Sequence, residues 1–89
     1  MANYKTLIKP SAAKELEFLP KKDRLRIVQR IQAFSETPRP PGCEKLSGEE
    51  KYRVRQGDYR VIYGVSDADR TVLILKIAHR KNVYRNIPD

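Results

Sequence analysis

The sequence predicts a small α+β domain with the element order β-α-α-β-β-β, in which an antiparallel sheet carries two helices packed on one face. Two patterns predict this class. Apolar residues recur at helical spacing in the first half of the chain and at alternating positions in the second half. A length of 89 residues suits one domain, residues 1–89, with a modest core.

The first half of the chain predicts a strand and two helices. Residues 4–10, YKTLIKP, are rich in β-branched and aromatic side chains and end at a proline, which indicates a short strand. Ser11 can cap a first helix that ends near Pro20, and a second helix is predicted from Lys21 to about Ser35. The apolar side chains expected in the core are Phe18, Leu25, Val28, Ile31 and Phe34.

The second half of the chain predicts a connector and three strands. Residues 36–48, ETPRPPGCEKLSG, hold three prolines and two glycines, which is typical of an extended connector. Residues 51–80 then read as three successive strands. A two-residue turn at Gln56-Gly57 would place Arg53 opposite Arg60 and Arg55 opposite Asp58.

Strand alternation divides these side chains between an apolar and a basic side. The apolar side is predicted to hold Tyr52, Val54, Tyr59, Val61, Tyr63, Val65, Leu73, Leu75 and Ile77. The other side is predicted to hold Arg53, Arg55, Asp58, Arg60, Lys76 and Arg80. Like charges opposite each other cost up to about 1 kcal/mol, so we interpret the arginine cluster as an anion-binding groove. The alternatives are a solvated face and, for Arg55, an ion pair with Asp58.

Composition narrows the class of partner and the compartment. A net charge of +8 favours a polyanionic partner, which could be nucleic acid, an anionic membrane surface or an acidic protein. With Cys43 as the single cysteine, no internal disulfide is possible and a zinc cluster is not credible, which fits a reducing cytosol. No apolar run approaches a membrane span, and Met1 to Pro10 lacks the apolar core of a signal peptide. We therefore expect a soluble, cytoplasmic protein without a metal or cofactor.

Two segments, KLSGEEKYRVRQGDYRVIYGV and KIAHRKNVYR, together with the element order, resemble the RelE/ParE superfamily of toxins from type II toxin-antitoxin pairs. The resemblance is to the RelE-like messenger-RNA interferase branch and covers residues 4–85. It implies the RelE-like fold, a cognate antitoxin as partner, and cleavage of messenger RNA, in many members on the ribosome. By position it also implies a catalytic set consisting of Arg53, Arg55, Arg60, Arg80 and Tyr84.

This chain departs from the best-known members of the branch in two ways. They have lysines where this chain has Arg53 and Arg55, and the spacing from the last arginine to Tyr84 is shorter here. Because arginine stays protonated, a proton-accepting role assigned to a lysine does not transfer, and the general base is left open.

RNA can be cut when its own 2′-hydroxyl attacks the adjacent phosphorus, which requires charge stabilisation and proton transfer. Clustered guanidiniums supply the first requirement without a metal ion. His79, the sole histidine, is either an acid-base group or a packed side chain that positions Arg80. Tyr84 could contact a base or the 2′-hydroxyl, or anchor the C-terminal segment on the helices. Further RNA contacts are expected from Lys51, Lys76, Lys81 and Arg85.

Two other functions are compatible with these residues. A ParE-like protein would have a similar fold but would inhibit DNA gyrase without being an enzyme. A simple basic RNA-binding module would need no convergent arginines.

Overall fold

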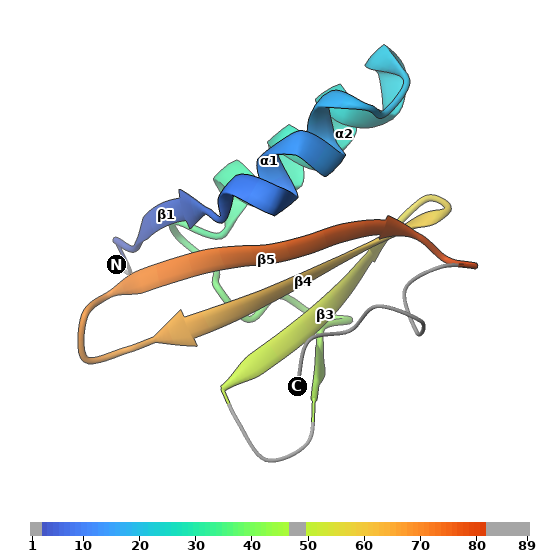
Figure 1. Ribbon diagram of the computed structural model, residues 1–89. Helices are drawn as coiled ribbons and strands as arrows, with labels where there is room; N and C mark the ends of the chain where they lie inside the picture. The colour runs from blue at the N-terminus through green and yellow to red at the C-terminus, as the bar shows by residue number, and fades with distance from the viewer. Residues whose placement is uncertain (1–2, 47–49, 82–89) are drawn as a thin grey trace.

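Five strands form one mixed sheet, and two helices cover one of its faces in the computed structural model, which describes residues 3–46 and 50–81 (Figure 1). The spatial order of the strands is β1-β5-β4-β3-β2. The elements are β1 (Lys5–Ile8), α1 (Pro10–Glu17), α2 (Lys21–Ala33), β2 (Glu44–Lys45), β3 (Lys51–Gln56), β4 (Tyr59–Ser66) and β5 (Thr71–His79). The predicted order and layers are confirmed, with a two-residue strand added inside the predicted connector.

The sheet is mixed instead of wholly antiparallel, because β1 runs parallel to β5. Their register extends from Lys5 opposite Thr71 to Ile8 opposite Ile74. The other neighbouring strands pair antiparallel. A parallel pair requires a long crossover, and here the chain passes through both helices and three strands before β5 returns beside β1.

Helix α1 begins two residues earlier than a Ser11 cap would allow. Lys9 is the N-cap residue and makes no side-chain capping hydrogen bond, and Pro10 occupies the first turn. Proline suits this position because its fixed φ is helical and because an N–H in the first turn has no partner within the helix. The predicted capping role of Ser11 is therefore wrong.

Helix α2 agrees with its predicted bounds, but its buried stripe differs. Ile27, Ile31 and Phe34 are buried at intervals of four and three residues. Each helical residue advances about 100°, so Leu25 points away from Ile27 and is 53% exposed. Phe18 caps the C-terminal end of α1 and is 86% exposed, so its predicted core role is also wrong.

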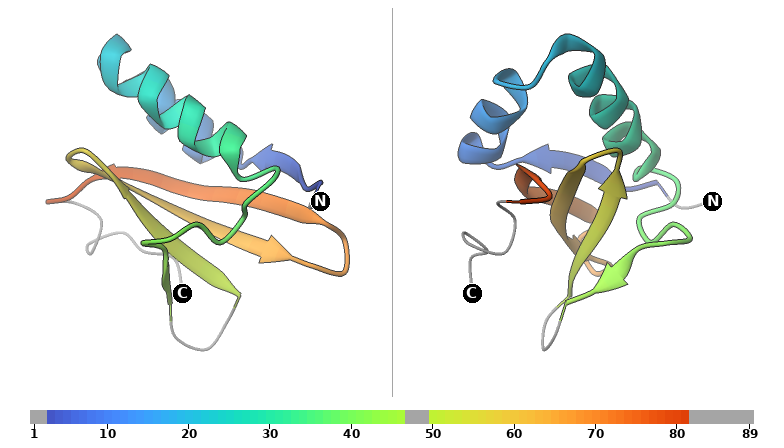
Figure 2. Two further views of the ribbon diagram at one scale, coloured as in Figure 1. Left: turned by 180° about the vertical axis from the view of Figure 1, so that it is seen from behind. Right: turned by 90° about the vertical axis from the view of Figure 1, so that its right-hand side faces the viewer.

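The core lies between the helices and the sheet. The Phe34 ring stacks on Tyr63 with 4.2 Å between centroids, and Tyr63 stacks on Tyr52 at 5.8 Å. Helix α1 lies over β5, and α2 lies over β3 (Figure 2). The helices therefore cover one face and leave the opposite face, which we call the outer face, for other contacts.

The β3–β4 hairpin turns at Gly57-Asp58, one residue later than predicted. Gln56 pairs with Tyr59, Arg55 with Arg60 and Arg53 with Ile62. Gly57 has φ +60°, a left-handed conformation that glycine adopts without steric cost. The predicted pairs Arg53–Arg60 and Arg55–Asp58 are thus wrong by two residues. A shift of two leaves every side chain on its predicted face.

A β-bulge changes the faces of β5. Ile62 pairs with Lys76, whereas the next residue of β4, Tyr63, pairs with Ile74. Leu75 is therefore the extra residue, and the alternation reverses across it. The core receives Val72, Ile74 and Ile77. The predicted core roles of Leu73 and Leu75 are wrong, and Leu73 is exposed on the outer face.

Candidate functional site

Two rows of side chains cross the outer face near the β3–β4 turn. Strand register places Arg55, Arg60 and Ala78 in one row, with each residue on a different strand. Ala78 carries only a methyl group, so the two long side chains of this row are Arg55 and Arg60. The next row consists of Arg53, Ile62 and Lys76. The fold therefore brings three predicted arginines together on one surface.

Arg80 lies at the edge of this surface. Its backbone N–H donates a 2.8 Å hydrogen bond to the Asp58 carbonyl oxygen, which fastens the end of β5 to the β3–β4 turn. Its side chain is exposed, and alternation from Ala78 places it on the outer face. Arg80 thus lies just beyond the row of Arg55, Arg60 and Ala78, beside the β3–β4 turn.

Arg53 is partly buried and forms an ion pair with Glu44. Its side chain is only 14% exposed, and its Nη2 lies 3.3 Å from Oε1 of Glu44. The neighbouring Ile62 is 1% exposed although it lies on the outer face, away from the helix-side core.

The predicted RNA-binding lysines are not all beside the arginines. The Lys76 ammonium lies 2.6 Å from Glu15 Oε2, and Glu15 Oε1 also accepts a 3.0 Å hydrogen bond from the Ile77 N–H. The charge of Lys76 is therefore directed to α1. Lys51 lies four residues from Arg55 on β3, where it pairs with Gly64 of β4. Lys81 is exposed and follows Arg80 directly.

His79 lies on the helix side of the sheet. Its ring contacts Tyr59 edge-on with 5.5 Å between centroids, and its Nδ1 accepts a 3.3 Å hydrogen bond from the Lys81 N–H. A neutral His79 therefore carries its proton on Nε2. This geometry fits the packed alternative, in which His79 holds the chain at Arg80. Tyr84 and Arg85 lie outside the described residues.

Glu44 is a site residue that the sequence interpretation missed. The short strand β2 pairs Glu44 with Arg53 and so places its carboxylate on the outer face, where it is 62% exposed. Proline and glycine dominate the surrounding segment, and two strand residues are too few to produce a visible alternation. Only the pairing of β2 with β3 in the folded chain identifies Glu44 as a neighbour of Arg53.

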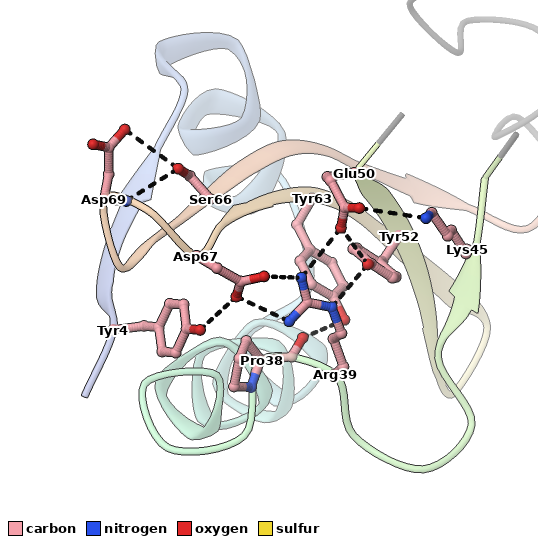
Figure 3. Close-up of polar contacts among 10 residues, drawn as sticks. All are labelled: Tyr4, Pro38, Arg39, Lys45, Glu50, Tyr52, Tyr63, Ser66, Asp67 and Asp69. Carbon is pink, nitrogen blue, oxygen red and sulfur yellow. Dashed lines mark hydrogen bonds and ion pairs between the residues drawn. The ribbon is translucent and has the colours of Figure 1, made fainter. Parts of the chain in front are cut away.

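A polar network occupies the opposite end of β4 (Figure 3). Arg39 donates to both Asp67 oxygens at 3.1 and 2.9 Å, to Glu50 at 3.2 Å and to the Tyr52 hydroxyl at 2.8 Å. The Tyr4 hydroxyl donates to Asp67 at 2.5 Å. Hydrogen bonds with Asp67, Tyr52 and Glu50 raise the pKa of Arg39. The network ties the connector to the sheet.

The carboxylates of this network are held in their charged forms. The Tyr52 hydroxyl and the Arg39 guanidinium lower the pKa of Glu50, and Arg39 and Tyr4 lower the pKa of Asp67. In the core beneath, burial raises the pKa of Tyr63, whose hydroxyl donates a 2.8 Å hydrogen bond to the Pro38 carbonyl.

The outer face is basic at the β3–β4 turn and apolar at the β4–β5 turn. At the apolar end a groove of about 790 Å³ is lined by Leu7, Leu73, Leu75 and Gly64, with Glu50 and Asp69 among its polar residues. Leu7 and Leu73 are both exposed there. The two halves could contact different parts of a partner.

Comparison with known proteins identifies the class. A family model described as the ParE toxin of the type II toxin-antitoxin system parDE matches residues 7–84. The putative toxin RelE1 of Methanocaldococcus jannaschii is 35% identical, over 82% of this chain and 86% of that protein. Toxin RelE of Mycobacterium tuberculosis is 32% identical, over 96% of this chain and 90% of that protein.

Solved structures agree with the sequence relatives. The archaeal RelE–RelB complex of Pyrococcus horikoshii contains a chain with a TM-score of 0.78 and 32% identity, covering 88% of this chain and 96% of that one. The RelBE2 toxin-antitoxin complex of M. tuberculosis also gives 0.78, at 27% identity over 89% and 100% of the two chains. The chain belongs to the ParE toxin family of type II toxin-antitoxin systems. Within the RelE/ParE superfamily it is a RelE-like toxin of a toxin-antitoxin pair.

Proposed function

We propose that this toxin is a metal-independent endoribonuclease that cleaves messenger RNA on the ribosome. The observation that supports it is the meeting of Arg53, Arg55 and Arg60 on the outer face, with Arg80 at the edge. Planar guanidiniums hold phosphate oxygens in pairs and stabilise the charge of a phosphorane-like transition state. This set therefore suits attack at a phosphodiester.

Arg55 and Arg60 are the pair best suited to the phosphate. They face each other across two strands, so two guanidinium side chains lie next to each other on the outer face. A phosphate bound between them would make an attractive contact with each. The same two guanidiniums would then bind the substrate and stabilise the transition state.

Glu44 is the group we assign as proton acceptor. Arginine cannot accept a proton at any working pH, whereas a carboxylate can. The Arg53 guanidinium, 3.3 Å away, holds Glu44 beside the basic surface. In the proposed step, Glu44 takes the proton of the 2′-hydroxyl while the 2′-oxygen bonds to phosphorus. The bond from phosphorus to the 5′-oxygen breaks, and that oxygen takes a proton from water. The products are a 2′,3′-cyclic phosphate and a 5′-hydroxyl.

The partners of the proposed activity are messenger RNA, the ribosome and a cognate antitoxin. Several related toxins have solved structures in complex with RelB antitoxins, which supports a similar partner for this chain. Messages and ribosomes place the proposed activity in the cytoplasm. Neither helix within the described residues is long and apolar enough to cross a bilayer.

The test is single-turnover cleavage of a defined message with and without ribosomes, the ribosome-free reaction being run at high toxin concentration with and without EDTA. We expect ribosome-stimulated cleavage, a slower ribosome-free reaction that EDTA leaves unchanged, and fragments ending in a cyclic phosphate and a 5′-hydroxyl. Fragments with a 3′-hydroxyl and a 5′-phosphate would contradict the 2′-hydroxyl mechanism, since they require water as the nucleophile.

A second candidate function is inhibition of DNA gyrase, because the matching family model is described as the ParE toxin. This function would not depend on the arginine row. If the protein blocks supercoiling by gyrase, leaves RNA intact and retains its effect when Arg60 is replaced, the second candidate is correct.

A further inference from the structure

Helix α2 carries a basic surface that the proposed cleavage site does not use. Of its thirteen residues, KKDRLRIVQRIQA, five are lysine or arginine and only Asp23 is acidic. Three of the bases, Lys22, Arg26 and Arg30, recur at intervals of four residues and so form one row along the helix. We call these three residues the basic flank. The apolar stripe of α2 lies beside this row and faces the core.

The basic flank lies on the β3 side of α2. On the opposite side of the helix, Arg24 donates to the Glu17 carbonyl oxygen of α1 at 3.5 Å. Arg30 instead donates through Nη2 to the Arg55 carbonyl oxygen of β3 at 3.3 Å. Figure 2 shows α2 over the β3 side of the sheet and α1 over the β5 side.

Among residues 3–46 and 50–81, no strand covers the edge of β3 where Arg30 reaches Arg55. Strand β2 pairs with β3 only at Tyr52 and Arg53. The Arg55 side chain is exposed and belongs to the outer face. Arg30, which is half-buried, therefore lies between the exposed Arg55 side chain and the exposed bases Arg26 and Lys22 of α2, so basic residues extend from the outer face around the β3 edge onto α2.

Ion pairs compensate only part of the basic surface. Arg39, Lys45, Arg53 and Lys76 each lie within 4.0 Å of a carboxylate. In residues 3–46 and 50–81, by contrast, no ion pair includes Lys22, Arg26 or Arg55. Lys22 and Arg26 are also exposed. The positive charge of these three side chains is therefore available to an anionic partner.

We propose that the basic flank binds the phosphates of the RNA strand next to the cleavage site, so that the message passes from the outer face over the β3 edge onto α2. This inference rests on the proposed function. The row from Lys22 to Arg30 is about 12 Å long, because eight residues rise 1.5 Å each, and a flexible single strand can follow it. Lys22 and Arg26 are binding residues without a role in the chemical step.

The test measures RNA affinity against salt for two double variants of equal charge. Lys22→Gln/Arg26→Gln removes the flank contacts. Lys5→Gln/Lys9→Gln removes two exposed bases at β1. Two uncleavable RNAs with a 2′-deoxy substitution at the cleavage step are used, one short and one lengthened on both sides. Circular dichroism and thermal unfolding verify that each variant is folded.

For the long RNA we expect the flank variant to lose about 1.4 from the slope of log affinity against log salt, two phosphates at about 0.7 each. Because the electrostatic gain vanishes near 1 M salt, this slope corresponds to about 25-fold weaker binding at 0.1 M. The short RNA should bind the flank variant as it binds the parent. Single-turnover cleavage at saturating RNA should stay within about twofold of the parent rate, since the flank takes no part in the chemistry.

Three results would overturn the inference: equal losses in the two double variants, equal losses for short and long RNA, or a loss that occurs only when ribosomes are present. The last result would assign the flank to ribosomal RNA instead of the message. If the parent protein neither binds nor cleaves RNA, the proposed function fails. If the parent cleaves RNA and the flank variant behaves like the β1 variant, only the present inference fails.

Discussion

Arg55 and Arg60 face each other directly across the β3–β4 ladder, one pair before Gln56 and Tyr59, which flank the turn. Like charges in directly opposite positions reduce the stability of a sheet unless other groups compensate them. The pair lies beside Ala78, and the backbone of Arg80 is bound to the β3–β4 turn. Under the proposed function, this pair is the part of the outer face that binds the phosphate.

Replacing Arg55 by Thr should separate stability from activity. Removal of the repulsion should leave the free energy of unfolding unchanged or raise it by up to about 1 kcal/mol. Loss of a guanidinium from the transition state should lower the single-turnover cleavage rate about 100-fold. Urea unfolding and cleavage of a ribosome-bound message measure the two effects. Lys5→Thr, at an exposed base of β1, is the control and should leave both unchanged. Full activity in Arg55→Thr would remove Arg55 from the site.

Replacing Arg80 by Ala should have a similar outcome for a different reason. The side chain is exposed at a strand end and its backbone contact with Asp58 remains, so unfolding should change by no more than about 1 kcal/mol. Cleavage should fall about 100-fold or more. Lys81→Ala should weaken RNA binding without slowing the chemical step. Undiminished cleavage and growth inhibition by folded Arg80→Ala would favour the gyrase-inhibitor function.

Replacing Glu44 by Gln tests the proton acceptor. The amide keeps the size of the side chain but cannot take the 2′-hydroxyl proton, so cleavage should fall by about 10² to 10⁴. RNA binding should be retained or improved, because a negative charge beside Arg53 is lost. Glu36→Gln, at another exposed carboxylate, is the control. A Glu44→Gln variant with the parental rate would exclude Glu44 as the base.

Replacing Arg39 by Met should alter the response of the fold to acid. Glu50 and Asp67 have pKa values below their ordinary range in the folded protein, so their contribution is present above the ordinary carboxyl pKa of about 4 and is lost as pH falls through the lower folded values. Arg39→Met should lower the free energy of unfolding at pH 7 and should flatten the decline in stability as pH falls below the ordinary carboxyl pKa. Urea midpoints across this range measure it, and an unchanged acid decline would contradict the network.

Replacing Tyr63 by Phe should destabilise the fold without affecting catalysis. The buried hydroxyl donates to the buried Pro38 carbonyl, and its removal leaves that oxygen without its hydrogen bond, at a cost of about 1–3 kcal/mol. Urea unfolding measures the loss. Tyr59→Phe, at a half-buried ring, should cost less. If Tyr63→Phe is as stable as the parent, the Pro38 contact contributes nothing.

Predictions from local pattern succeeded where chemistry and geometry act over a few residues. Helix α2 has a clear apolar period, and its bounds were predicted to within two residues. The assignment of Arg53, Arg55 and Arg60 to one face was also predictable, because strand alternation has a period of two. The exact register was not, since a turn at Gln56-Gly57 or at Gly57-Asp58 satisfies the same pattern.

The sequence by itself determined the element order, the face of the β3 and β4 side chains and the excess of positive charge, because these depend on spacing and composition. Only the tertiary structure decided that β1 pairs with β5 in parallel, that a bulge at Leu75 turns Leu73 outward, and that Glu44 lies beside Arg53. Each of these joins residues through pairing between strands, which no local period encodes. The choice among such pairings is made by the free energy of packing the whole sheet against the helices.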